Sequence, residues 1–133
     1  MASATKRIRV LICNKYTLFR EGIKALLEQG TPIEIVGEAN TAAEAIEQLE
    51  RLKPDVVLMD VGTPDLTGFE ATQRMKALDP NVKVLILSMY EDEALISRCL
   101  EAGASGYIRQ NLRGAQLQSA IDAACRTSDR AAA

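Results

Sequence analysis

The carboxylate of Asp60 is the group whose position in the sequence most clearly suggests chemistry. Asp60 ends an apolar run, residues 56–59, and precedes a turn at residues 61–68 that contains Gly and Pro. A carboxylate at the end of a buried strand must be solvated, paired or bound to a metal. The position suggests a nucleophilic carboxylate that accepts a phosphoryl group. The alternative is that Asp60 only caps the turn.

The composition excludes several classes of enzyme. The chain of 133 residues contains no histidine, so it lacks the commonest general base and the commonest ligand of catalytic zinc. Hydrolases that depend on a serine–histidine or cysteine–histidine pair are therefore excluded. An enzyme that uses Cys13 as its nucleophile is disfavoured for the same reason, because no imidazole can activate the thiol.

Charge and cysteine content narrow the interpretation further. Sixteen basic and eighteen acidic residues give a formal net charge of −2, whereas a nucleic-acid-binding module usually carries a basic excess. Cys13, Cys99 and Cys125 are odd in number and widely spaced, which favours buried thiols over disulfides or a metal site. The sequence shows no signal peptide and no apolar run of bilayer length, so we expect a soluble, cytoplasmic domain without membrane contact.

The elements that position these residues follow from hydrophobic periodicity. Five short apolar runs alternate with five stretches in which apolar residues recur at helical spacing. The strands are predicted at residues 8–13, 33–37, 56–60, 82–87 and 106–108. Strict alternation of strand and helix is typical of an α/β domain in which helices cover both faces of a parallel sheet.

The helices are predicted from stripes of apolar residues and from their end signals. The predicted buried stripes are Phe19, Ile23, Leu26 and Leu27; Ala42, Ala45, Ile46 and Leu49; Ala71, Met75 and Leu78; Leu95, Ile96, Cys99 and Leu100; and Leu117, Ala120, Ile121 and Ala124. Thr41 and Glu44 have the spacing of a capping box at the start of the second helix. The Ala-rich end, residues 128–133, is predicted to be a tail or linker stub.

Sites in such sheets lie beyond the carboxyl ends of the strands. The polar residues at those positions are Asn14, Lys15, Asp60, Ser88, Arg109 and Gln110. The ends of the first and third strands should lie together, so we expect Asn14 and Lys15 beside Asp60.

Several segments together resemble the receiver domain of bacterial response regulators. They are residues 8–12, 18–22, 36–39, 54–60, 87–90 and 101–107, in the order and at the spacing of that family. The resemblance is greatest to receivers that precede a LuxR-type helix-turn-helix domain, and it covers residues 7–127. It implies a flavodoxin-like (βα)5 doubly wound parallel sheet with strand order 2-1-3-4-5, and a regulatory rather than an enzymatic role.

The resemblance also implies roles for individual residues. Asp60 takes the phosphoacceptor position of the family. Ser88 takes the position of the switch hydroxyl, which hydrogen-bonds the phosphoryl group. Tyr107 takes the position of the switch aromatic, whose rotamer reports the state of that hydroxyl.

Other positions of the family's site are changed. Asn14 and Lys15 replace the acidic pair after the first strand, Gln110 replaces the lysine after the fifth strand, and Gly62 stands where a residue lends a carbonyl to the metal. Phosphoryl transfer to a carboxylate needs positioned positive charge, usually Mg²⁺ and a lysine. Mg²⁺ is usually held by one or two carboxylates. With the ammonium of Lys15 at such a position, we expect weak Mg²⁺ binding or none, and no other cofactor.

Lys15 and Asp60 are instead predicted to form a direct ion pair that takes the place of the metal. Two unit charges about 4 Å apart gain roughly 4 kcal/mol at an effective dielectric constant near 20, before desolvation is subtracted. The alternative is that the flexible Lys15 side chain extends into solvent. Arg109 could also turn inward, and Gln110 could hydrogen-bond Asp60.

The leading hypothesis is a receiver domain whose output does not depend on phosphorylation. It would act through a homodimer, a sensor kinase or a small ligand, and would reach DNA only through a C-terminal domain outside this sequence. The dimer is predicted to use the last helix, because Leu112, Leu117, Ile121 and Cys125 exceed what one buried stripe needs.

Two alternative functions are compatible with the fold. The first is a receiver that accepts a phosphoryl group on Asp60 despite its altered surroundings. The second is a flavodoxin-like protein that binds a flavin or nucleotide. A flavodoxin-like protein needs a loop rich in Gly, Ser or Thr after the first strand, and residues 13–17 contain only Thr17 of these types.

Overall fold

Five parallel strands form one sheet in the order β2-β1-β3-β4-β5. They are β1 (Ile8–Cys13), β2 (Ile33–Ala39), β3 (Val56–Asp60), β4 (Lys83–Ser88) and β5 (Gly106–Arg109). The computed structural model describes residues 7–28, 32–60, 67–88, 93–109 and 114–132. The strand order confirms the predicted doubly wound topology. Three of the strands end one or two residues later than predicted, at Ala39, Ser88 and Arg109.

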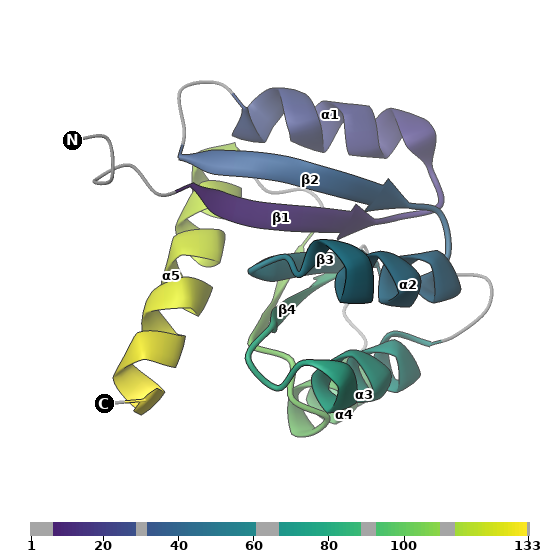
Figure 1. The fold of residues 1–133 in the computed structure, drawn as a ribbon, viewed down its shortest axis with the longest axis vertical. Helices are drawn as coiled ribbons and strands as arrows, with labels where there is room; N and C mark the ends of the chain where they lie inside the picture. The colour runs from purple at the N-terminus through teal and green to yellow at the C-terminus, as the bar shows by residue number, and fades with distance from the viewer. Residues whose placement is uncertain (1–6, 29–31, 61–66, 89–92, 110–113, 133) are drawn as a thin grey trace.

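Helices alternate with the strands along the chain (Figure 1). They are α1 (Thr17–Leu27), α2 (Ala42–Leu52), α3 (Gly68–Leu78), α4 (Glu93–Glu101) and α5 (Gly114–Ala132). α1 and α5 bury one core cluster against the sheet, and α2, α3 and α4 bury another. β3 is buried along its whole length because it lies between both clusters. Val56 and Leu58 belong to one cluster, and Val57 and Met59 belong to the other.

The outer limits of the apolar stripes differ from the prediction. Three residues assigned to buried stripes are exposed: Leu26 by 48%, Leu78 by 46% and Leu100 by 43%. On α1 the buried positions are Arg20, Ile23 and Leu27, which recur at i, i+3 and i+7 and so share one helix face. A charged residue therefore lies on the face that packs against the sheet.

α2 and α3 both begin directly after a threonine whose side chain caps the helix. The Thr41 hydroxyl accepts a hydrogen bond from the Glu44 amide, as predicted, but the Glu44 carboxylate accepts from the Asn40 amide rather than from Thr41. A complete capping box, which the sequence analysis missed, joins Thr67 and Glu70 at the start of α3.

The last helix is longer than expected. α5 continues to Ala132, through most of the predicted tail. The boundary of the domain at residue 127 stays a prediction. No helix in the described ranges is long and apolar enough to cross a lipid bilayer.

α3 and α4 contact each other through a cation–π pair. The Arg98 guanidinium carbon lies 4.4 Å from the centroid of the Phe69 ring. This distance is well within the range in which a cation is attracted to an aromatic face.

Candidate functional site

The strand register brings Asn14 and Asp60 to the same edge of the sheet. Cys13 pairs with Met59, so the residues that follow them, Asn14 and Asp60, lie side by side. Neighbouring strands are about 4.8 Å apart. Asp60 in turn pairs with Leu87 of β4, and Ser88 follows. The predicted juxtaposition of these strand ends is therefore present.

Asp60 and Asn14 are both buried at this edge. Asp60 is 8% exposed and Asn14 is 1% exposed. The burial results from the surrounding sheet, since β1 and β4 flank β3 and helices cover both faces. Asp60 is therefore held at the carboxyl edge of the sheet, which is where parallel α/β sheets place their binding sites.

Asn14 uses its polar atoms within the turn that follows β1. Its amide donates to the Ala39 carbonyl at 3.0 Å, and its side-chain Oδ1 accepts from the Tyr16 amide at 2.8 Å. This is the local side-chain-to-backbone bonding by which Asn stabilises turns. The Asn14 side-chain oxygen is thus directed to the backbone of its own turn.

Lys15 is exposed and lies over an aromatic ring. Its Nζ is 5.1 Å from the centroid of Tyr16, a cation–π distance. The predicted direct ion pair between Lys15 and Asp60 stays a prediction.

The remaining predicted site residues are only partly described. Tyr107 lies on β5 with 40% of its surface exposed, and its neighbour on β4 is Ile86. Ser88 is the last residue of β4, but its side chain lies outside the described part, as does that of Arg109. Gln110 and Gly62 also lie outside the described residues.

The described donor set does not fit Mg²⁺. No group of three or more His, Cys, Asp or Glu side chains within the described ranges could hold a metal ion. Asp60 supplies one carboxylate, the Asn14 oxygen is used within its turn, and Lys15 brings a positive charge. Mg²⁺ prefers six oxygen ligands in near-octahedral geometry. Weak or absent Mg²⁺ binding stays a prediction.

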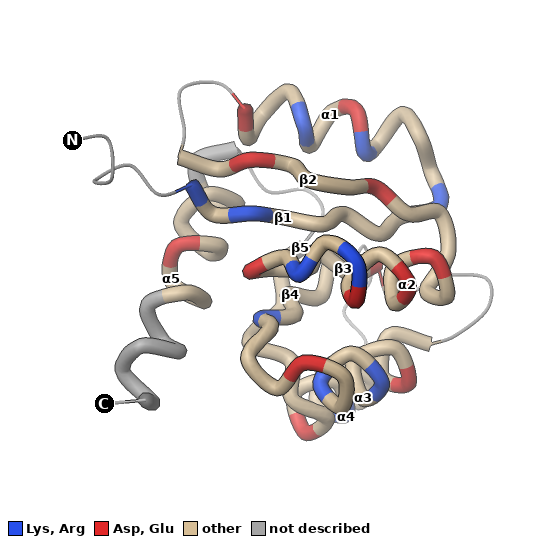
Figure 2. Tube along the Cα trace, in the orientation of Figure 1, with Lys and Arg blue, Asp and Glu red and all other residues tan. Residues whose placement is uncertain are grey.

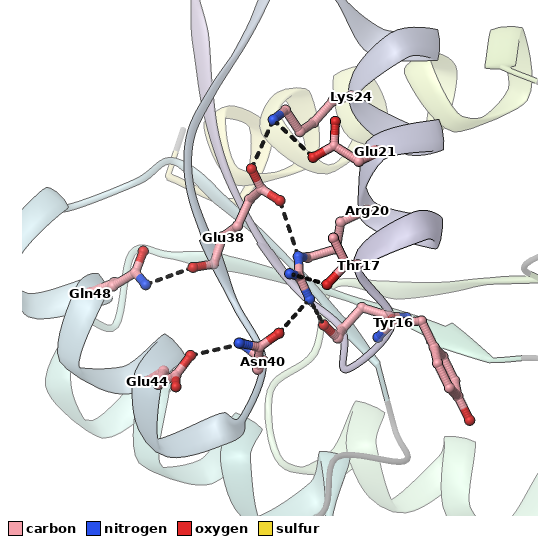
Figure 3. Close-up of polar contacts among 10 residues, drawn as sticks. Tyr16, Thr17, Arg20, Glu21, Lys24, Glu38, Asn40, Glu44 and Gln48 are labelled. Atoms are coloured by element: carbon pink, nitrogen blue, oxygen red, sulfur yellow. Dashed lines mark hydrogen bonds and ion pairs between the residues drawn. The ribbon is translucent and has the colours of Figure 1, made fainter.

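Arg20 is the residue of this edge that the sequence analysis missed. It is 7% exposed, and Figure 3 shows its guanidinium among polar groups from several elements. Nε donates to Glu38 at 3.0 Å, and Nη2 donates to the Thr17 hydroxyl at 3.1 Å. Nη1 donates to the Asn40 side chain at 2.7 Å and to the Asn14 carbonyl. Arg20 thus joins α1 to the ends of β1 and β2.

Glu38 links this arginine to the surface. Its second oxygen pairs with Lys24 at 2.9 Å, and Lys24 also contacts Glu21 at 3.5 Å. The hydrogen bond from Lys24, aided by Arg20, holds the pKa of Glu38 below its ordinary value, while the same bond raises the pKa of Lys24. The Glu38 carbonyl accepts a hydrogen bond from the Gln48 side chain at 2.7 Å, which connects α2 to the polar contacts around Arg20 and Glu38 (Figure 3).

Two further features of the described residues lie away from this edge. Acidic and basic positions are interspersed along the helices (Figure 2). A cavity of about 460 Å³ lies at the opposite edge of the sheet, between the amino ends of β1, β3 and β4 and Cys125 of α5. It is lined by Asp55, the residue before β3, whereas Asp60 ends that strand. The cavity is therefore separate from the candidate site.

Comparisons with known proteins agree on one family. The profile of the response regulator receiver domain matches residues 10–122. The transcriptional regulatory protein DegU of Brevibacillus brevis is 36% identical over 115 residues, which are 86% of this chain and 49% of that protein. The response regulator GacA of Pseudomonas viridiflava is 37% identical over 114 residues, which are 86% of this chain and 53% of that protein.

Solved structures agree with the sequence comparison. A two-component response regulator of the LuxR family from Aurantimonas sp. SI85-9A1 has a TM-score of 0.86 and 32% identity, covering 91% of this chain and 86% of that one. The chain spans about half the length of the curated relatives it matches.

Proposed function

Because the chain belongs to the response regulator receiver domain family, we propose that it is the regulatory receiver of a transcription regulator and that its output is independent of phosphorylation on Asp60. The names of the relatives, a transcriptional regulatory protein and response regulators, support the first part. Contact with DNA and recognition by a sensor kinase would then be properties of the whole protein rather than of this chain alone.

The turn after β1 is the observation that carries the second part. At the two positions where the family has acidic residues, this turn carries Asn14 and Lys15. Asn14 is neutral and accepts a hydrogen bond from the Tyr16 amide, and Lys15 is exposed and lies over the Tyr16 ring. Transfer of a phosphoryl group to Asp60 would break the donor's P–O bond, form a P–O bond to the carboxylate and accumulate negative charge there. Without positioned cations such a transfer loses its main stabilisation.

The test is phosphorylation by acetyl phosphate with Mg²⁺, followed by intact mass spectrometry. The native chain is compared with a triple variant, Asn14→Asp, Lys15→Asp and Gln110→Lys, which restores the family's charged positions. We expect the native chain to react at least about 100-fold more slowly, the size of effect seen when such electrostatic groups are removed. In the triple variant, a further Asp60→Asn substitution should abolish labelling.

The competing function, a working phosphoacceptor, makes the opposite prediction. If the native chain gains a phosphoryl group on Asp60 as quickly as the triple variant, the phosphorylation-independent proposal is wrong. A saturable Mg²⁺ titration of the native chain, lost in Asp60→Asn, would contradict it independently.

We also propose that the domain forms a homodimer, and that exposed apolar residues of α1 rather than of α5 form its contact. Leu117 and Ile121 of α5 lie in the core and Cys125 packs against it, and Leu112 lies outside the described residues. On α1, Leu18 is 85% exposed and Leu26 is 48% exposed. They recur eight residues apart with exposed Gly22 between them, so they share one helix face.

Light scattering across a range of protein concentrations tests this surface. Leu18→Glu should shift the native chain from dimer to monomer, because it places a charge in the middle of a buried apolar contact. Leu78→Glu on α3, a residue of similar character that is 46% exposed, is the matched control and should leave the dimer intact. A native chain that stays monomeric, or equal dissociation by both substitutions, would contradict the proposal.

A further inference from the structure

We propose that Arg20 is a positioning residue of the candidate site, which fixes the turn at Asn14–Tyr16 and thereby sets where the side chains at positions 14 and 15 lie relative to Asp60. This inference takes the location of the site from the proposed function. It does not depend on whether Asp60 accepts a phosphoryl group.

The donor geometry of Arg20 carries the proposal. Four of its N–H groups reach oxygens of four residues: Glu38, Asn40, Asn14 and Thr17. These acceptors belong to β2, the residue after β2, the residue after β1 and α1 itself. A planar guanidinium can serve acceptors in several directions of one plane, whereas the lysine ammonium is a compact charge with three donors.

The hydrogen bond from Arg20 to the Asn14 carbonyl adds to the contacts that hold the turn in place. The Asn14 amide is held by Ala39, its side chain by the Tyr16 amide, and its carbonyl by Arg20. Every backbone and side-chain acceptor of this residue thus has a partner, and Asn14 is 1% exposed. Loss of the guanidinium would leave the buried Asn14 carbonyl without that donor, which is costly inside a protein. The turn would then exchange among other arrangements.

The charge of Arg20 is compensated without using the site. Glu38 neutralises it at 3.0 Å from the side of β2, and Lys24 pairs with the other Glu38 oxygen. The guanidinium can therefore stay buried next to the β1 turn, with its charge balanced by Glu38 of β2. This arrangement separates the residue that holds the turn from the residue that would react.

Amide hydrogen exchange followed by NMR tests the proposal on the native chain. Arg20→Gln should accelerate exchange of the Asn14 and Tyr16 amides at least tenfold, while the amides of Val57 and Leu58 in β3 should change no more than in the control. The control is Glu21→Gln, the adjacent position on α1, whose side chain is 56% exposed and contacts only Lys24 among the described ion pairs. A general loss of stability would accelerate all of these amides together.

If Arg20→Gln does not fold, a more conservative variant, Arg20→Lys, still allows the exchange measurement. Arg20→Lys retains the charge but not the fork of donors, so it should produce the same local pattern with a smaller acceleration. Unchanged exchange at Asn14 and Tyr16 in a folded variant, or equal acceleration in β3, would overturn the proposal. Phosphorylation of the native chain would instead contradict the proposed function and leave this inference standing.

Discussion

Glu38 shows how single residues around the site depend on one another. Its carboxylate lies between the buried Arg20 and the surface residue Lys24, and its pKa is held below the ordinary value chiefly by the hydrogen bond from Lys24. A carboxyl whose pKa is lower in the folded state adds stability above its unfolded pKa. That stability is lost as the pH falls through the folded value.

We therefore expect Glu38→Gln to destabilise the domain in a pH-dependent manner. Near pH 7 the loss should be about 1–3 kcal/mol, the range for removing a charged hydrogen-bond partner. The difference from the native chain should shrink as the pH falls below 4.5, the ordinary pKa of Glu38, because the native carboxyl then becomes neutral too. Urea unfolding at several pH values measures this. A difference that does not change between pH 7 and pH 3 would contradict the assigned cause.

At the scale of elements, two glycines occupy opposite environments. A Cβ on Gly37 of β2 would lie 2.4 Å from the Gln48 side-chain oxygen and 2.8 Å from a Leu52 methyl group, both on α2. A Cβ on Gly22 of α1 would meet nothing within 4 Å. Gly37 therefore permits the close packing of α2 on the sheet, whereas Gly22 leaves the middle of α1 with unneeded backbone freedom.

The two alanine substitutions should accordingly act in opposite directions. Gly37→Ala should lower the free energy of unfolding by about 1–3 kcal/mol, because the added methyl overpacks the β2–α2 contact. Gly22→Ala should raise it by about 0.5–1 kcal/mol, because alanine loses less backbone entropy in a helix. Denaturant unfolding of both variants measures the two effects. Equal signs would show that the packing against α2 does not explain Gly37.

At the scale of the whole molecule, the sheet was predictable because three of its five strands are nearly continuous aliphatic runs. β3 was placed to the residue, since residues 56–59 are all apolar and Asp60 ends the run. Strand order came from the family resemblance rather than from the spacing of the runs.

The polar part of the site was harder to predict. Arg20 lies on the same helix face as Ile23 and Leu27, and that spacing was the available signal, but arginine is rarely buried without a partner. Apart from Thr17 on the same helix, its partners come from the ends of β1 and β2, so they could not be identified until the fold was known. The Lys15–Asp60 pair stays a prediction for a related reason: sequence position places two strand ends together, but it does not decide where a long flexible side chain points.

The stacking of Arg98 on Phe69 has a mechanical consequence for the face of the sheet that α3 and α4 cover. A displacement of α4 alone would wet the aromatic ring and separate the two flat groups in one step. The two helices are therefore mechanically coupled. A force that shifts α4 either moves α3 with it or must first separate the Arg98 guanidinium from the Phe69 ring.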